Sequence, residues 1–222
     1  MGDSHFVRSI EKGWHEVLKQ IGVAGYECED IIIYLAGIVS KLGKKTAIVD
    51  RSEQEMLCEM LGIEALGEKT VREREYCGIW ISNQTVCAEE FDVVFYLFGY
   101  RLNHPKIHAC EEILMITDGV PAHSSLLRML NPGEGQRYLV IRNLTALKHT
   151  SDYLAELADS KNAYCELPYD EKDIRQRCSL SSYGGFELKR LSTGMRRTLL
   201  GIACFFMREY PKSVICNVMK KM

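Results

Sequence analysis

Apolar residues in this chain occur both in short runs and at helical spacings, and the clearest example lies close to its start. Residues 21–24 form an apolar run that predicts a strand, and Gly25 begins a tight turn. Apolar positions then recur with a helical period over about residues 30–42, and a second apolar run over residues 46–49 ends at Asp50. A strand, a helix and a second strand of these lengths predict a βαβ unit with a right-handed crossover.

The remainder of the chain continues this alternation. A continuous apolar run rich in β-branched and aromatic residues predicts a strand buried on both faces at residues 91–98. Further strands are predicted at residues 113–117 and 138–141, with a last short strand at residues 164–167. Helical spacing predicts helices at about residues 4–18, 53–61, 122–130 and 150–158, and a final helix from about 185 or 191 to 209. Residues 71–86 predict a small hairpin or two edge strands around Ser82, Asn83 and Gln84. The order predicts an α/β fold, a single doubly wound, mainly parallel sheet flanked by helices.

Composition indicates an ordinary globular protein but does not indicate its function. With 222 residues, 46% of them hydrophobic and 26% charged, we expect a single domain over residues 1–222, with residues 1–19 as a helical extension. The net charge of -2 gives no reason to expect a nucleic-acid partner. No apolar run reaches the roughly 18 residues of a membrane span, and residues 1–13 lack a signal-peptide core, so we expect a cytoplasmic protein.

Cysteine and histidine residues raise the question of a metal site. The nine cysteines form no CxxC pair. Most lie in apolar runs, so we expect reduced core residues, namely Cys58, Cys77, Cys87, Cys110 and Cys204. His104 and His108 flank Pro105, which disfavours the helix that would bring them to one metal ion, so we interpret them as exposed loop residues. His123 follows a strand end where ligands bind in such folds, but one histidine does not make a site. We expect no metal.

The chain contains, in order, the segments YLAGIVSKLGKKTAIVD, FDVVFYL, EEILMITDGVPAHSSLLRML, YLVIRN and ELPYDEKDIRQRCSL. Together they resemble the MinD/ParA family of ATPases with a deviant Walker A motif. That family includes relatives that position pilus-assembly and secretion machinery. The resemblance extends from Gln20 to Tyr210 and implies a P-loop NTPase-like fold.

The resemblance also implies where the family's phosphate loop would lie. Its KGGVGKTT loop corresponds to residues 23–30. The family's signature lysine is then Val23, its phosphate-binding lysine is Cys28, and its magnesium-binding hydroxyl is Glu29. Within this loop only the glycine at Gly25 is retained.

The family's other motifs are altered as well. The Walker B aspartate corresponds to Leu97, and the second aspartate, which helps to activate water, corresponds to Ser52. Asp50 matches the family's first aspartate, and Asn143 matches the asparagine that recognises the base. Asp50 and Asn143 are therefore the candidate remnant of a nucleotide pocket.

Charge in the degenerate loop argues against phosphate binding. Glu27, Glu29 and Asp30 lie at the predicted start of the first helix, where they complement the helix dipole and would repel a triphosphate. Leu97 offers no oxygen to a magnesium ion. Cys28 could be a reactive thiol at a helix N-terminus, but the neighbouring carboxylates favour an inert residue. We expect no catalytic residue and no cofactor.

Three hypotheses follow for the function. The first is a non-catalytic pseudo-ATPase that acts as an interaction or localisation protein in a bacterial assembly, with a protein partner or as a homodimer. The alternative is a nucleotide-binding protein that holds ATP or ADP through Asn143 without efficient hydrolysis. The third is an enzyme that uses Asp50 and histidines, for which no nucleophile–base pair is evident. The tail VICNVMKKM is too short for more than weak peripheral membrane contact, so we expect it to pack on the protein.

Overall fold

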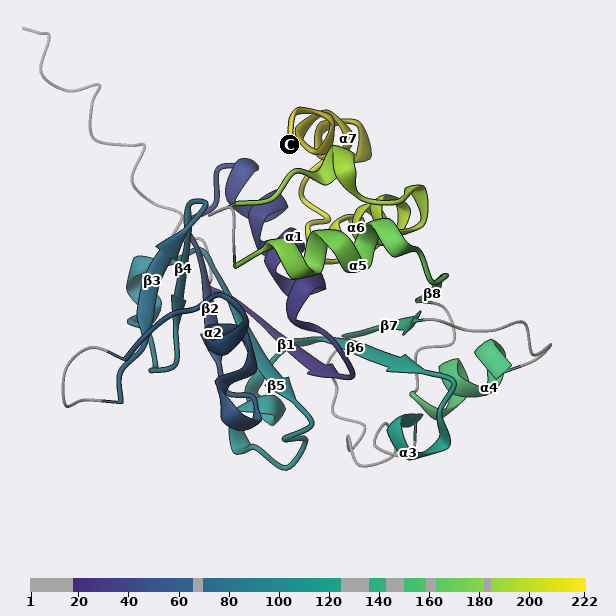
Figure 1. Ribbon diagram of the computed structural model, residues 1–222, viewed down its shortest axis with the longest axis horizontal. Coiled ribbons are helices and arrows are strands. Elements are labelled where there is room, and N and C mark those ends of the chain that lie inside the picture. Colours follow the sequence, from purple (N-terminus) through teal and green to yellow (C-terminus); the bar gives the residue numbers. More distant parts are fainter. Residues whose placement is uncertain (1–17, 66–69, 125–135, 143–149, 159–162, 182–184) are drawn as a thin grey trace, which may run out of the picture.

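The computed structural model describes residues 18–65, 70–124, 136–142, 150–158, 163–181 and 185–222. These residues form one eight-stranded sheet with the strand order β3-β4-β2-β5-β1-β6-β7-β8 (Figure 1). The strands are β1 (Lys19–Gly25), β2 (Thr46–Asp50), β3 (Glu73–Tyr76), β4 (Ile79–Ser82), β5 (Val93–Gly99), β6 (Glu112–Asp118), β7 (Gln136–Arg142) and β8 (Tyr164–Leu167). Neighbouring strands run parallel, except for β3 and β4, which pair antiparallel. The predicted α/β fold with a mainly parallel sheet is confirmed.

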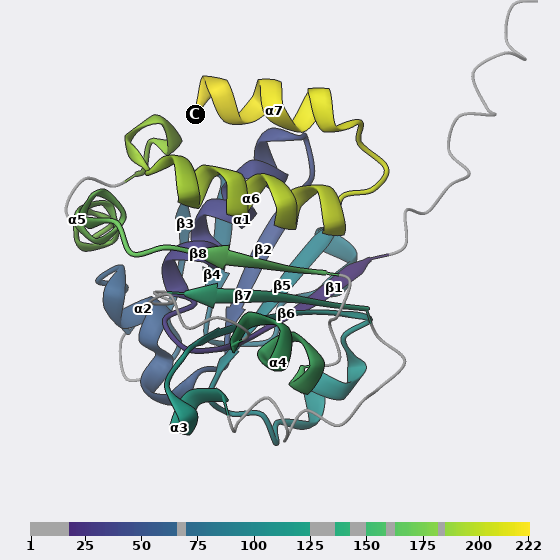
Figure 2. The same ribbon diagram turned by 90° about the vertical axis from the view of Figure 1, so that its right-hand side faces the viewer.

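Helices cover the two faces of the sheet unequally. On one face lie α1 (Glu29–Lys41), α6 (Thr193–Phe206) and α7 (Lys212–Lys221), and on the other the described residues include the short α-helices α3 (Pro121–Ser124) and α4 (Thr150–Leu157) (Figure 2). The remaining α-helices, α2 (Met56–Met60) and α5 (Glu171–Ser179), flank the carboxyl ends of the central strands (Figure 1).

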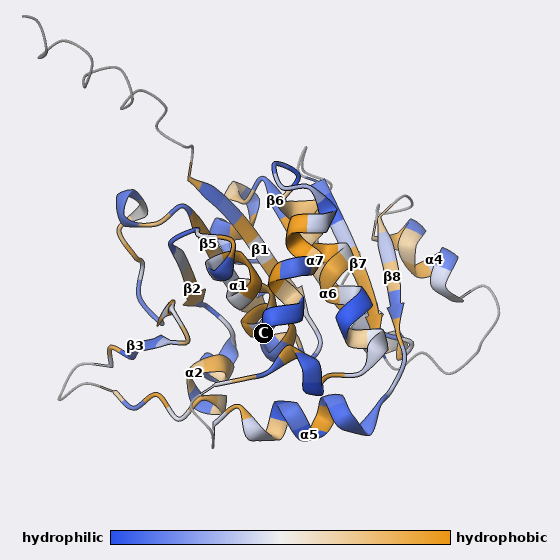
Figure 3. Ribbon diagram, turned by 90° about the horizontal axis from the view of Figure 1, so that it is seen from above, coloured by the Kyte–Doolittle hydropathy of each residue, from blue (hydrophilic) through white to orange (hydrophobic). Residues whose placement is uncertain are grey.

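The central elements form where they do because their residues are apolar on every side. All seven residues of β5 are buried, as expected for a strand covered on both faces. In α1 the residues from Glu29 to Val39 are buried, since the helix lies between the sheet and both α6 and α7. Figure 3 shows hydrophobic colours in α1 and the strands around it, and mostly hydrophilic colours along α5.

The position of the hairpin turn was predicted wrongly. The hairpin exists, but its turn is at Cys77 and Gly78, and not around Ser82, Asn83 and Gln84. Cys77 has a φ of 55° and Gly78 a φ of 79°. Two consecutive positive φ angles match the twist of a two-residue hairpin, and cysteine is an uncommon residue for this conformation. The apolar pattern therefore located the strands without locating their turn.

Several helix predictions need correction. The segment predicted as one helix at residues 53–61 is divided, because Gln54 and Glu55 have positive φ angles of 60° and 54° and only α2 continues as an α-helix. The sequence analysis missed α5 because its residues are mainly polar; Asp170 caps it by accepting a hydrogen bond from the Lys172 N–H at 2.9 Å. Most of the helix expected at residues 4–18 lies outside the described residues.

The expectation of core positions for five cysteines is confirmed only in part. Cys58 and Cys110 are buried and Cys204 is half-buried, whereas Cys77 and Cys87 are exposed, so the prediction was wrong for these two. An apolar neighbourhood in sequence does not bury a residue that lies in a turn or a surface segment. In the described part of the chain no helix has both the length and the apolarity needed to cross a membrane.

Candidate functional site

The loop that follows β1 lies at the carboxyl edge of the sheet and requires a glycine. Gly25 has a φ of +120°, and a Cβ atom on it would lie 1.8 Å from the carbonyl oxygen of Ile116 in β6. The Tyr26 N–H donates a hydrogen bond to the same oxygen at 2.8 Å. The retained glycine therefore allows the loop to approach the neighbouring strand closely.

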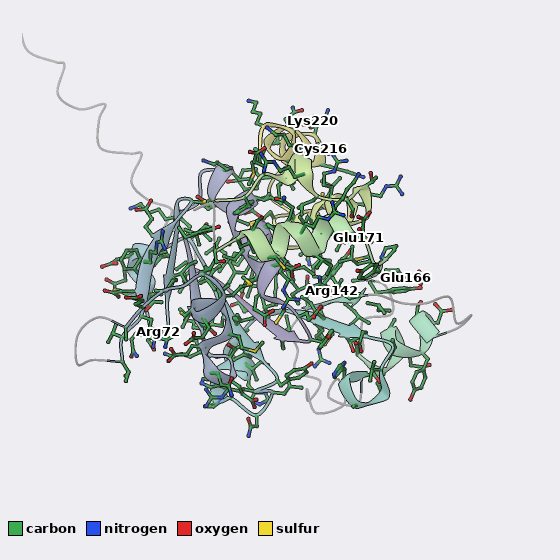
Figure 4. All side chains as sticks on the ribbon, viewed as in Figure 1. Arg72, Arg142, Glu166, Glu171, Cys216 and Lys220 are labelled. Atoms are coloured by element: carbon green, nitrogen blue, oxygen red, sulfur yellow. The ribbon has the colours of Figure 1, made fainter. Side chains whose placement is uncertain are left out.

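A buried ion pair occupies the start of α1. Both guanidinium Nη atoms of Arg142, at the end of β7, donate hydrogen bonds to the Asp30 carboxylate, at 2.8 and 3.1 Å. Arg142 also donates to the carbonyl oxygen of Glu27. Asp30 and Arg142 are 0% and 2% exposed. Figure 4 shows Arg142 in the interior of the molecule beneath α5. This bidentate pair joins the loop to the carboxyl end of β7, the second strand from β1 in the sheet.

A second arginine reaches the same loop from α5. Arg177 forms ion pairs with the carboxylates of Glu27 and Glu29, each at 3.1 Å. Two guanidinium groups therefore meet the three carboxylates of the loop. The expectation that these carboxylates mainly complement the helix dipole was incomplete, because two of the three share Arg177 and Asp30 is neutralised by Arg142.

Burial determines the protonation behaviour of the loop. It raises the pKa of the Glu29 carboxyl above its ordinary value, and the nearby Arg177 works in the opposite direction. It also raises the pKa of the Cys28 thiol well above the ordinary range, and the carboxylates of Glu29 and Asp30 add to that shift. A buried neutral thiol is a poor nucleophile, which supports the interpretation of Cys28 as inert.

Asp50, one of the two residues proposed as a remnant nucleotide pocket, is engaged within the protein. Its carboxylate accepts hydrogen bonds from the N–H and hydroxyl of Ser52 at 3.0 and 2.6 Å, and from the N–H groups of Leu57 and Cys58 at 2.9 and 3.1 Å. It therefore holds the start of α2. The other residue, Asn143, lies outside the described residues.

The side chains around the loop do not fit a magnesium triphosphate. Val23 is fully buried within β1, beside Leu97 of β5 and Leu114 of β6, and offers no charge to a phosphate. Leu97 is also fully buried and has no oxygen for a metal ion. Two arginines of the described residues, Arg142 and Arg177, reach the loop. Both already form ion pairs with its carboxylates.

The chain is similar to known proteins in structure but matches none of the compared families or curated proteins in sequence. No protein-family profile and no curated protein sequence matches the chain. Solved structures do: MinD in the MinC:MinD cell division complex of Aquifex aeolicus is 9% identical, with a TM-score of 0.64 over 87% of this chain and 97% of that one. A ParA family ATPase from Chlorobium tepidum is 12% identical, with a TM-score of 0.61 over 83% and 97%. An ATP complex of Cyanothece McdA is 11% identical, with a TM-score of 0.64 over 88% and 98%.

The chain has a MinD/ParA-like fold. At 9 to 12% identity this likeness concerns the backbone alone, and it covers nearly the full length of each of the three structures. The strand order places β1 between β5 and β6, so the loop after β1 lies where the order of the strands reverses. In open α/β sheets ligands bind at this position.

The two arginines were missed by the sequence analysis. Arg142 is separated from Asp30 by 112 positions and Arg177 from Glu29 by 148. One local signal was available, since Arg142 immediately precedes Asn143 at the predicted end of a buried strand. A charged residue at the carboxyl end of such a strand points to the same edge as the loop.

A histidine and two tyrosines form a second group at the same edge. His123 Nδ1 lies 2.8 Å from the Asp118 carboxylate. The His123 ring stacks on Tyr26 with ring centres 4.4 Å apart, and Tyr100 is 5.9 Å away. His104 caps the short 3-10 helix Pro105–Ala109 instead of joining this group. Among the described residues, no three metal-binding side chains gather at one point.

A cavity of about 640 Å³ opens beside the ion pairs, between α2 and α5. Its lining includes Glu27, Glu29 and Arg177 together with Met56 and Ile174. Met56 is a large apolar side chain that is 39% exposed. The cavity is therefore a partly apolar surface that ends at the degenerate loop.

Proposed function

We propose that this protein is a non-catalytic MinD/ParA-like protein that acts by binding other proteins. It serves as an interaction or localisation factor in a bacterial assembly of the pilus, secretion or partition type. It works with a protein partner or as a homodimer, and it does not hydrolyse ATP.

The ion-pair cluster at the start of α1 is the observation that carries this proposal. A phosphate loop binds its ligand through free helix N–H groups and cations. Here Asp30 pairs with one arginine, and Glu27 and Glu29 pair with the other. Three carboxylates and two guanidinium groups together carry one net negative charge. A phosphate that reached Arg142 would have to displace Asp30, and breaking a buried ion pair costs about 3–5 kcal/mol.

Titration calorimetry and thermal unfolding with ATP, with and without magnesium, test the proposal. We expect no binding heat, no change in melting temperature at millimolar ATP, and phosphate release no faster than in buffer. The comparison is sensitive, because a ligand at 100 times its Kd stabilises a protein by about 2.7 kcal/mol. Magnesium-dependent ATP binding or turnover by the unmodified protein would overturn the proposal.

A charge variant tests the physical reason. The substitutions Glu27→Gln and Glu29→Gln together leave Arg177 without its carboxylates, so we expect the variant to gain affinity for ATP and for pyrophosphate. The matched control carries Glu171→Gln and Glu187→Gln, which remove one exposed and one half-buried carboxylate that do not contact Arg177. It should gain nothing. Equal gains in both variants would assign the effect to net charge and not to Arg177.

The alternative function makes a different prediction in the same experiment. If Asn143 still binds an adenine base, adenosine should bind the unmodified protein more tightly than ATP, because each added phosphate approaches the acidic loop. Binding of neither ligand supports the interaction protein. The kind of assembly can be distinguished by neighbouring genes: pilus or secretion components favour a positioning role, and a partition site favours DNA segregation.

A further inference from the structure

Strand β3 forms one outer edge of the sheet, and among the described residues it pairs only with β4 (Figure 1). Directly before β3, the Arg72 carbonyl oxygen accepts a hydrogen bond from the Asn83 N–H at 3.0 Å. The direction of hydrogen bonding alternates along an antiparallel strand, so the N–H and C=O groups of Glu73 and Glu75 point away from β4. β3 therefore offers these backbone groups to a further strand.

The side chains that flank this edge are acidic. Glu73 and Glu75 are exposed on one face of β3, opposite Ser82 and Trp80 of β4. None of the ion pairs among the described residues includes either carboxylate. Opposite charges on neighbouring strands stabilise a sheet, so these carboxylates favour a cation on the strand that would follow β3.

A cavity of about 470 Å³ lies on the same face as these carboxylates. Its lining contains the carboxylates of Glu73, Glu75 and Glu90 and the ammonium group of Lys45, so three negative charges meet one positive charge. Trp80 also lines the cavity, and its half-buried side chain packs on the apolar cluster of this face. An aromatic ring beside carboxylates suits a cationic side chain, because the face of the ring and the carboxylates both attract positive charge.

We propose that the edge of β3 binds an extended segment of a partner protein that carries lysine or arginine at alternate positions. This inference rests on the proposed function, because it assigns the surface through which the protein binds others. The partner's backbone pairs with the outward N–H and C=O groups of Glu73 and Glu75, and its cationic side chains lie beside these carboxylates and Trp80. Main-chain hydrogen bonds supply affinity, and the alternating side chains supply specificity.

Charge argues against a second copy of the same edge as the occupant. When two β3 strands pair antiparallel about a two-fold axis, a register centred on Glu73 or on Glu75 places two identical carboxylates opposite each other. A register centred on Arg74 brings two guanidinium groups together and places Glu73 of each copy opposite Glu75 of the other. Like charges directly opposite are destabilising. The edge is thus protected against self-pairing while its backbone stays accessible to a basic strand.

Titration of the full chain with a synthetic peptide of alternating lysine and threonine residues tests the proposal by NMR. We expect amide hydrogen exchange to slow at Glu73 and Glu75 and to change little at Arg74 and Tyr76, which already face β4. Attraction between side chains alone would not produce this alternation. A peptide of alternating glutamate and threonine should not bind. Unchanged exchange at Glu73 and Glu75 with the lysine peptide in excess would overturn the proposal.

Two variants at one position separate the backbone from the charge. Glu75→Pro removes an outward N–H together with the carboxylate, whereas Glu75→Gln removes the charge alone. Proline is tolerated on an edge strand where its nitrogen faces solvent, so both variants should fold, as far-UV circular dichroism can confirm. Calorimetric titration should show severalfold weaker binding of the lysine peptide to Glu75→Gln and none to Glu75→Pro. Equal affinities for the two variants would overturn the backbone pairing.

Charge reversal tests the chemistry of the partner. Glu73→Lys with Glu75→Lys should bind the lysine peptide about tenfold more weakly and should now bind the glutamate peptide. The matched control, Glu53→Lys with Glu209→Lys, makes the same change in net charge at exposed residues outside the cavity lining and should alter neither affinity. Equal effects in the two double variants would overturn the proposal.

Two further outcomes separate this inference from others. Self-association of the unmodified protein that Glu75→Pro abolishes would overturn it, because the occupant would then be a second copy. If the protein binds neither ATP nor the lysine peptide, this inference fails and the proposed function stands. If it binds ATP with magnesium and also the lysine peptide in the expected way, the proposed function fails and the edge of β3 remains a binding surface.

Discussion

At the residue scale, Gly25 is the clearest case of a position fixed by geometry. An alanine there would combine a φ of +120° with a Cβ 1.8 Å from the Ile116 carbonyl oxygen. We expect Gly25→Ala to lower the free energy of unfolding by about 3 kcal/mol in urea titration. Gly62→Ala is the control, because Gly62 has a φ of +62° with no atom near its Cβ position, and should cost about 1 kcal/mol. Similar losses would contradict the clash as the cause.

The buried pair of Asp30 and Arg142 makes a second prediction at this scale. Either Asp30→Leu or Arg142→Met leaves one buried charge without its partner, and we expect each to destabilise the protein by about 3–5 kcal/mol. The double variant has no such charge and should lose clearly less than the sum of the two. Urea unfolding of all four proteins gives the coupling free energy. Additive losses would show that the pair does not act as a unit.

At the scale of elements, the start of α2 depends on Asp50. Its carboxylate accepts four hydrogen bonds from the chain that follows it, two of them from N–H groups of α2. Asp50→Ala leaves buried donors without an acceptor, and we expect a loss of about 3–5 kcal/mol in urea unfolding, with faster amide exchange in α2. Asp170→Ala removes an exposed cap of α5 and should cost about 1 kcal/mol. Equal losses would indicate that Asp50 has only an ordinary capping role.

At the scale of the whole molecule, stability should depend on pH through Glu29. Burial raises the pKa of its carboxyl above the ordinary 4.5, so the folded state binds more protons than the unfolded state in the interval between the two pKa values. The associated stability is fully present below the unfolded pKa and is lost as pH rises through the folded pKa. We expect Glu29→Gln to gain stability relative to the unmodified protein as pH rises above about 4.5.

Urea unfolding at several pH values measures this difference. Glu171→Gln is the control, because Glu171 is exposed and forms a surface pair with Arg175. The difference in free energy of unfolding between this control and the unmodified protein should vary little over the same pH interval. If the difference in free energy of unfolding between Glu29→Gln and the unmodified protein did not change with pH, the role of burial would be contradicted.

The fold was predictable because its signals are local. A strand buried on both faces must be apolar at successive positions, and α1 must be apolar on most of its surface, so β5 and α1 were visible in the sequence. The turn at Cys77 and Gly78 was not, because cysteine carries little preference for a positive φ. The polar helix α5 was missed for a similar reason, since its place depends on Asp170 and on contacts with the loop after β1. The single-domain organisation of residues 1–222 stays a prediction.

The sequence by itself determined what the degenerate loop lacks, because the identity of a side chain fixes whether it carries a charge or a metal-binding oxygen. Cys28 and Leu97 could be assessed without a structure. Only the tertiary structure decided what the loop contains, by bringing Arg142 and Arg177 to Asp30, Glu27 and Glu29. Electrostatic energy depends on distance in space. A loop with three carboxylates in sequence therefore keeps one net negative charge in the folded protein, because two arginines pair with them.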